Sequence, residues 1–189
     1  SSMARETGRD ALYTWAGPEI AVASTKAYIT QVEMMALLAI DLGLKRGTLE
    51  PKRAQELLTA LTALPEQAKE VLRLAGEAQR FASRHFDRKH VFYIGRGLEW
   101  ALAMEASLKL KEVSYIFSEA YAAGELKHGT IALIEEGSLV CALLTQHALA
   151  DKVLSNIREV KSRGAHILMI CAEDLCEKAR AVADELWLL

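Results

Sequence analysis

The chain has 189 residues, of which 51% are hydrophobic and 25% charged, a balance typical of a soluble globular protein with a sizeable core. Its 23 Lys and Arg residues against 25 Asp and Glu residues give a net charge of −2, so charge offers no argument for binding nucleic acid or an acidic membrane. No apolar run is expected to cross a bilayer and no signal peptide opens the sequence, which predicts a cytoplasmic protein without membrane contact.

The residues up to position 86 are predicted to be mainly helical. Residues 10–16 ("DALYTWA") form a short β-prone stretch, and the Gly-Pro pair after them is a strong turn signal. Ser24 is a good N-cap for a helix that Gly43 would end. Helical spacing of Leu and Ala then runs through residues 51–86 and predicts a helical bridge into a new unit.

From residue 90 onwards, apolar runs of strand type alternate with amphipathic helical segments. The predicted strands are "VFYI" (91–94), 138–145, 166–172 and 185–189, and the predicted helices are 98–113, 148–163 and 174–183. Gly164 is the expected C-cap of the middle helix. This alternation predicts an α/β fold with a mostly parallel, doubly wound sheet in three α/β/α layers.

Gly95-Arg96-Gly97 joins the first of these strands to a helix. A glycine turn between a strand and a helix N-terminus binds phosphate in many α/β folds, but any tight strand-to-helix turn also favours Gly. Both interpretations stay open for Gly95 and Gly97. The three cysteines, Cys141, Cys171 and Cys176, lack the spacing of metal ligands, so we expect buried or free thiols, no metal and no cofactor.

The helix after Gly97 carries charges on a mainly apolar background. In "EASLKLKE", Glu105, Lys109 and Glu112 fall on one helical face, within about 60° of one another. One interpretation is an ion-pair ladder on a solvent-facing surface. The other is a carboxylate base beside a lysine in a cleft, where partial burial raises its basicity and the lysine keeps it ionised.

A segment of small residues surrounds titratable side chains at 119–129 ("EAYAAGELKHG"). Alanine and glycine allow a backbone to approach another surface closely, and catalytic groups concentrate on loops held by a rigid scaffold. His128 is therefore a candidate catalytic residue, although a lone His is more often structural.

Three stretches of the sequence closely resemble one enzyme family. They are "AGPEIAVASTKAY" (16–28), residues 95–129 and "SNIREVKSRG" (155–164). They are similar to the isomerase half of the glutamine–fructose-6-phosphate aminotransferases, which consists of two sugar-isomerase (SIS) lobes. Thr130 departs from the family, which commonly has Pro there.

The resemblance implies roles for residues that the pattern alone could only propose. Glu112 would be the base that moves a proton between C1 and C2 of the sugar, and Lys109 a neighbouring lysine of the sugar site. His128 would open the sugar ring, and in this family it reaches across a dimer interface into the partner's site. Val22 and Ser24 would line the sugar pocket.

Glu105 shares the helix face of Glu112 and is a further expected pocket residue. The resemblance places the end of a first SIS lobe at 1–50, a helical linker at 51–88 and a second lobe at 89–189. It implies fructose 6-phosphate as substrate, glucosamine 6-phosphate as product and a homodimer.

The ends of the sequence and the family pattern together predict a piece of a longer protein. The chain starts with Ser and ends on the apolar run "ADELWLL". It lacks the family's glutaminase domain, phosphate-cradling loop and C-terminal lysine, so we expect the isolated chain to be inactive. Two alternatives stay open: an SIS phosphosugar isomerase or deglycase without glutaminase, and a non-catalytic SIS module that senses a sugar phosphate.

Overall fold

The structure is a computed structural model that describes residues 2–189. The chain divides into two compact units, Ser1–Glu70 and Val71–Leu189. This division falls inside the helical linker predicted for residues 51–88.

The first unit is helical. It contains α1 (Ser2–Thr7), the short 3-10 helix η1 (Gly8–Asp10), α2 (Lys26–Lys45) and most of α3 (Pro51–Leu72). The strand predicted for residues 10–16 is wrong, because residues 11–20 have no regular secondary structure. A strand needs a partner for its backbone groups, and the first unit offers no other strand among its described residues.

The ends of α2 differ from the prediction by two to four residues. The helix begins at Lys26, and the carboxylate of Glu19 caps it by accepting the backbone N–H groups of Thr25 and Ala27, each at 3.2 Å. At the other end the helix runs past Gly43 to Lys45, and the left-handed residue is Gly47, at φ 67°. The carboxylate of Glu19, six and eight residues before its two partners, therefore caps the helix in place of the expected Ser24.

Two further features of the helices concern their length. α3 continues through Pro65, so one helix spans Pro51–Leu72. α2 is long and apolar enough, by length and composition alone, to cross a membrane, which corrects the expectation that no apolar run approaches that length. One helix of this kind does not distinguish a membrane span from a core helix. An apolar pocket lies between α2 and α3 within the first unit, lined among others by Ala39, Ile40, Leu57 and Leu61.

The second unit contains a five-stranded parallel sheet in the order β2-β1-β3-β4-β5. Its elements are α4 (Ala75–His85), β1 (His90–Gly95), α5 (Leu98–Ser114), β2 (Phe117–Ala122), β3 (Leu139–Leu144), α6 (Ala150–Lys161), β4 (His166–Cys171), α7 (Cys176–Arg180) and β5 (Glu185–Leu188). Short 3-10 helices connect them: η2 (Ala123–His128), η3 (Thr130–Leu133), η4 (His147–Leu149) and η5 (Glu173–Leu175). The predicted α/β fold with a parallel sheet is confirmed.

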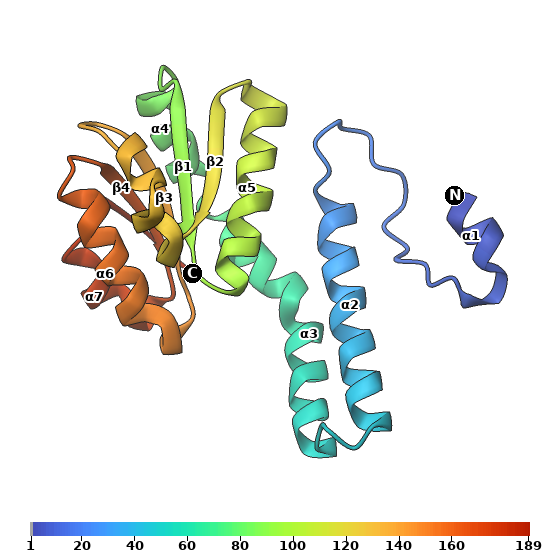
Figure 1. The fold of residues 1–189 in the computed structure, drawn as a ribbon. Coiled ribbons are helices and arrows are strands. Elements are labelled where there is room, and N and C mark those ends of the chain that lie inside the picture. The colour runs from blue at the N-terminus through green and yellow to red at the C-terminus, as the bar shows by residue number, and fades with distance from the viewer. Residues whose placement is uncertain (1) are drawn as a thin grey trace. The chain divides into compact units, whose positions relative to one another are not determined.

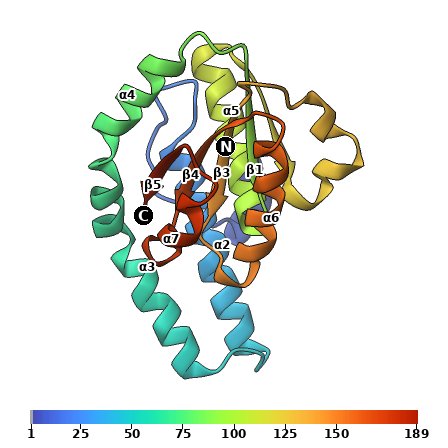
Figure 2. The same ribbon diagram turned by 90° about the vertical axis from the view of Figure 1, so that its left-hand side faces the viewer.

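Helices cover both faces of this sheet. α6 and α7 lie on one face and α5 on the other, as Figure 1 shows. α4 shares the α5 face on the β5 side, where the rings of Phe81 and Trp187 are 5.5 Å apart (Figure 2). Alternate residues of the central strand serve the two layers: Val140 and Ala142 pack under α6, whereas Leu139 and Cys141 pack on the α4–α5 side.

β2 was not predicted, because residues 119–129 were expected to form a loop. β2 is an edge strand paired only with β1 among the described strands, and four of its six residues are only partly buried. Its sequence, "FSEAYA", carries Ser118 and Glu119 and lacks β-branched residues, so it has little of the usual strand signal. Burial against α5 and pairing with β1 override that weak propensity.

Candidate functional site

The charged stripe on α5 is an assembled ion-pair triad. The ammonium of Lys109 lies 2.6 Å from Oε2 of Glu112 and 3.3 Å from Oε1 of Glu105. The hydrogen bond with Glu112, followed by the interaction with Glu105, raises the pKa of Lys109. The lysine therefore stays protonated at neutral pH and bridges the two carboxylates.

The triad is withdrawn from water compared with an ordinary surface pair. The side chains of Glu105, Lys109 and Glu112 are 20%, 23% and 27% exposed. The i,i+4 pair of Asp41 and Lys45 on α2 is 51% and 70% exposed. All three side chains of the triad are therefore less exposed than those of the α2 pair.

The opposite face of α5 is fixed to the sheet. Ala103 and Ser107 are buried there, and the Ser107 hydroxyl lies 3.0 Å from that of Ser118 in β2. At about 100° per residue, Lys109 and Glu112 point away from this contact. The packing of the apolar face thus sets the rotation of the helix and determines where the triad points.

His128 occupies the last position of η2, which buried neighbours anchor. Ala123 and Leu126 are almost fully buried, and Lys127 pairs with Glu159 of α6 at 2.8 Å. His128 itself is exposed, and Gly129 follows with a φ of 136° that a side chain would strain. The loop is therefore held rigidly while its histidine projects outward.

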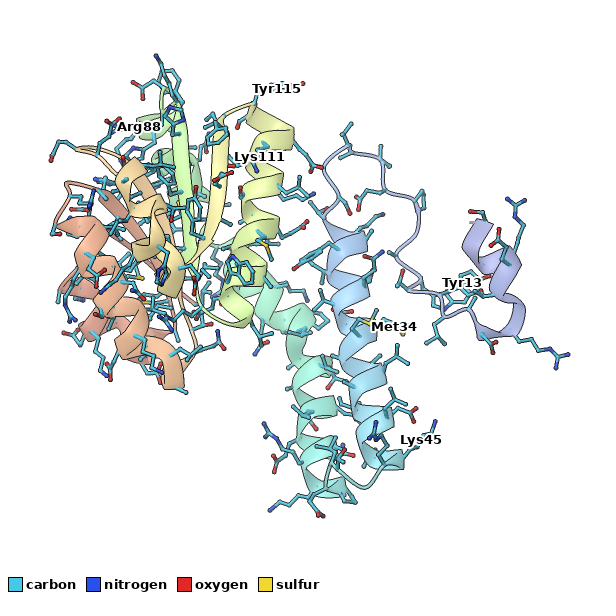
Figure 3. All side chains as sticks on the ribbon, viewed as in Figure 1. Tyr13, Met34, Lys45, Arg88, Lys111 and Tyr115 are labelled. Atoms are coloured by element: carbon cyan, nitrogen blue, oxygen red, sulfur yellow. The ribbon has the colours of Figure 1, made fainter. Side chains whose placement is uncertain are left out.

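The structure places Glu112 and His128 at opposite ends of the sheet. α5 returns from the carboxyl end of β1 to the amino end of β2, so Glu112, two residues before the end of α5, lies near the strand starts. Figure 3 shows its neighbour Lys111, with Tyr115, at the same end of the sheet as Arg88, which lies two residues before the start of β1. His128 follows the carboxyl end of β2, and the six residues of that strand separate the two ends by about 20 Å.

The expected pocket residues Val22 and Ser24 belong to the first unit. Val22 is 92% exposed, in the irregular segment before α2. The Ser24 hydroxyl is 3.5 Å from the capping carboxylate of Glu19. Their role in a sugar pocket remains a prediction from the resemblance.

Glu99, which was not predicted as a site residue, packs against the turn after β1. The carboxylate of Glu99, which is only 4% exposed, accepts hydrogen bonds from the backbone N–H groups of Thr145 and Gln146 and from the Thr145 hydroxyl. A bound phosphate would need such donors and would be repelled by this carboxylate. Gly95 is required for packing, because a Cβ there would lie 2.5 Å from the Glu99 carbonyl carbon. The geometry favours a tightly packed turn over a phosphate site at Gly95 and Gly97.

A second site feature that the sequence did not signal lies between α5 and β2. The Tyr121 hydroxyl donates to the carboxylate of Glu119, and burial together with this bond raises the pKa of Tyr121 to about 12. Both residues line a small depression with Met104, Ser107 and Lys111. They became visible only once β2 was placed beside α5.

Comparison with known proteins agrees with this architecture. Residues 86–182, just over half of the chain, match the model of the SIS domain. The chain belongs to the SIS domain family.

The relatives of this SIS chain include long enzymes of which it spans less than a third. It is 56% identical over 168 residues to the glutamine–fructose-6-phosphate aminotransferase (isomerizing) of Caldanaerobacter subterraneus subsp. tengcongensis, covering 89% of this chain and 28% of that protein. It is 50% identical over 188 residues to the protein of the same name from Clostridium tetani, covering 31% of that protein.

Solved structures show the same SIS arrangement. The C-terminal domain of glucosamine-fructose-6-phosphate aminotransferase from Francisella tularensis superposes with a TM-score of 0.86 at 34% identity, over 92% of this chain and 48% of that one. A putative phosphosugar isomerase from Silicibacter pomeroyi gives a TM-score of 0.70 at 26% identity, over 93% and 48% of the two chains. The expected resemblance to the aminotransferases is confirmed.

Proposed function

We propose that this SIS chain is the sugar-phosphate isomerising part of a glutamine–fructose-6-phosphate aminotransferase. The whole reaction would convert fructose 6-phosphate and glutamine-derived ammonia into glucosamine 6-phosphate, in a longer protein that also carries a glutaminase domain. The observation that carries the proposal is the half-buried Glu105–Lys109–Glu112 triad, in a chain 50–56% identical to enzymes of that name.

The chemistry needs a carboxylate of this kind. After ammonia condenses with the C2 carbonyl, a base must remove a proton from C1 and return it to C2. Glu112 would carry that proton, and Lys109 would hold the carboxylate in a fixed position through the 2.6 Å contact. Glu105 would hold the other side of the ammonium and, together with Val22 and Ser24, would line the sugar pocket.

A chimeric enzyme tests the proposed reaction. Residues 1–189 replace the matching segment of the Caldanaerobacter subterraneus relative, and glucosamine 6-phosphate is measured with fructose 6-phosphate and either glutamine or ammonia. We expect product from both nitrogen sources. Aldose phosphate formed without amination would instead identify a phosphosugar isomerase, and sugar-phosphate binding without turnover would identify a sensor.

We further propose that the working unit is a homodimer in which His128 serves the partner's site. Its ring would shuttle the proton of the hemiketal hydroxyl during ring opening, a task suited to a group that titrates near neutral pH. The separation of Glu112 and His128 by the length of β2 supports this, because one subunit alone cannot bring both to one sugar carbon chain. A two-fold interface would create two identical mixed sites.

Mixing two inactive variants tests the shared site. Chimeras with His128→Ala and with Glu112→Gln are each expected to be nearly inactive, whereas a mixed dimer regains one working site of two. With random exchange of equal amounts, half of the dimers are mixed, so activity should recover to about a quarter of the wild-type value. Absence of recovery after verified exchange would mean that His128 acts in its own subunit or not at all.

A further inference from the structure

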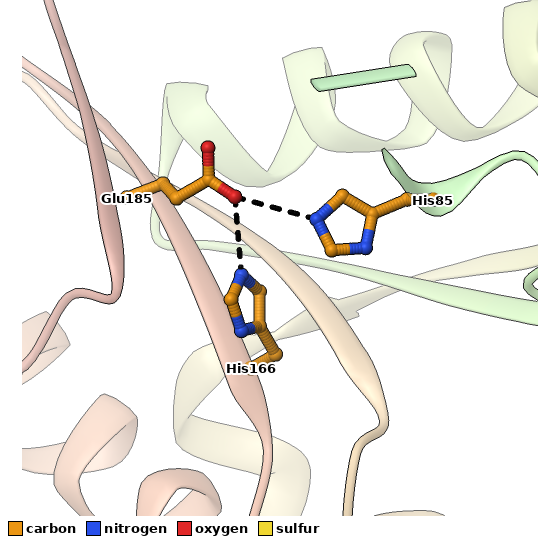
Figure 4. Close-up of side chains that lie close together, drawn as sticks. All are labelled: His85, His166 and Glu185. Carbon is orange, nitrogen blue, oxygen red and sulfur yellow. Dashed lines mark hydrogen bonds and ion pairs between the residues drawn. The ribbon is translucent and has the colours of Figure 1, made fainter. Parts of the chain in front are cut away.

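A cluster of potential metal ligands lies outside the proposed site. His85 ends α4, His166 begins β4 and Glu185 begins β5, so distant segments meet at the amino end of the sheet. Figure 4 shows both imidazole rings turning Nε2 toward the same carboxylate. Each Nε2 is 3.3 Å from Oε1 of Glu185, and the three ligand atoms lie within 4.8 Å of one another.

We propose that His85, His166 and Glu185 bind a zinc ion. Zinc in proteins is held tetrahedrally at 2.0–2.1 Å by His nitrogen and carboxylate oxygen, which separates neighbouring ligand atoms by about 3.3–3.4 Å. Two of the three ligand–ligand distances already have this value. The two ring nitrogens would approach by at most about 1.5 Å from their limit of 4.8 Å to complete the face, a movement open to the half-exposed His166.

The same distances fit a hydrogen-bonded ion pair less well. Charge-assisted N–H···O bonds are typically about 2.7–2.9 Å long. His147 and Asp174 form such a pair on the surface of this chain, with Nε2 2.6 Å from the carboxylate. Two contacts of 3.3 Å to one oxygen are the spacing expected of atoms that share an ion.

Neighbouring charged side chains fix the orientation of the Glu185 and Asp184 carboxylates. Arg84 pairs with Oε2 of Glu185 and leaves Oε1 facing the rings. Asp184 lies 4.0 Å from Nδ1 of His166, beyond hydrogen-bond distance, and is itself held by Lys161 and the backbone N–H of Ile167.

The position of the cluster points to a stabilising role for the ion. The three ligands come from three different elements at the amino end of the sheet. An ion here would tie α4 to β4 and β5 on the α4 side of the sheet. Ligands separated by 81 and 19 positions leave no spacing motif, so this site could not be predicted from the sequence.

Zinc titration of the 189-residue chain, free of tags and chelators, tests the proposal. Zinc at about 100 times its dissociation constant should raise the melting temperature by about 5–10 °C. His166→Ala and Glu185→Gln should each abolish the rise, with folding verified by circular dichroism. His147→Ala is the matched control, because it removes a histidine from a carboxylate pair elsewhere, and it should retain the full rise.

Cobalt identifies the ligands directly. Cobalt(II) bound at this cluster should give visible bands of a tetrahedral nitrogen–oxygen site, absent from His166→Ala. A near-ultraviolet thiolate band would place the ion on Cys141, Cys171 or Cys176 and overturn the proposal. A melting temperature unchanged by zinc, or a rise that persists in both cluster variants, would also overturn it.

Discussion

Lys109 holds the central position of the charged triad on α5. Its ammonium contacts both carboxylates, and its pKa is raised by the hydrogen bond with Glu112 and by Glu105. A raised lysine pKa means that the ammonium contributes its stabilisation at neutral pH and loses it only as the pH rises through that value. Lys109 therefore carries its positive charge at the pH at which the enzyme would work.

Replacing Lys109 by Met in the chimeric enzyme should show how far Glu112 depends on the ammonium. Without it, two carboxylates would share one helix face with no positive charge between them, and Glu112 would lose the contact that positions it. We expect kcat to fall about tenfold or more. Lys69→Met, in the exposed i,i+3 pair with Glu66 on α3, is the matched control. A wild-type kcat in Lys109→Met would contradict the role of the bridge.

At the scale of secondary-structure elements, the contact between β1 and α5 depends on Gly95, which has no side chain. A Cβ at Gly95 would lie 2.5 Å from the carbonyl carbon and 2.6 Å from the carbonyl oxygen of Glu99, both rigid backbone atoms. Gly95→Ala should therefore lower the free energy of unfolding by about 3 kcal/mol or more, measured by urea denaturation of the chain.

Gly76→Ala is the control, because we expect it to change the free energy of unfolding in the opposite direction. Gly76 is the second residue of α4, and the nearest atom to an added Cβ is the flexible end of Arg80 at 3.6 Å. Alanine should raise the free energy of unfolding there, by no more than the ~1 kcal/mol of a helix interior. Equal and small effects of both substitutions would contradict the packing described for Gly95.

The sequence predicted those elements whose burial leaves a strong pattern. β3 is buried at all six positions, so its apolar run identified it, and the charged stripe of α5 identified the triad. β2 was missed because its stability comes from tertiary contacts, whereas residues 10–16 have strand propensity without a described partner. Glu99 was invisible because its partners, Thr145 and Gln146, lie 46 and 47 positions away.

At the scale of the whole molecule, α2 exposes apolar side chains that we expect another protein surface to bury. Val32 and Met35 are 52% and 67% exposed, and Ile29 and Leu42 are 55% exposed. Exposed apolar patches mark interaction sites. With the homodimer proposed above, we expect sedimentation of the 189-residue chain to show a reversible dimer.

A double variant, Val32→Glu with Met35→Glu, should shift that equilibrium to monomer, because each buried carboxylate would have to lose its hydration. Leu72→Glu, at the end of α3 and 70% exposed, is the control and should leave the dimer intact. A wild-type chain that sediments as a monomer, or that floats with lipid vesicles, would contradict this account of α2.

The most direct test of the proposed activity is the Glu112→Gln substitution in the chimeric enzyme. Glutamine keeps the size of the side chain but cannot accept the C1 proton, so kcat for glucosamine 6-phosphate formation should fall by about 10²–10⁴. KM for fructose 6-phosphate should change little, and Glu125→Gln, on the exposed loop before His128, should be as active as wild type. A Glu112→Gln enzyme that turns over at the wild-type rate would contradict the assignment of this carboxylate as the base.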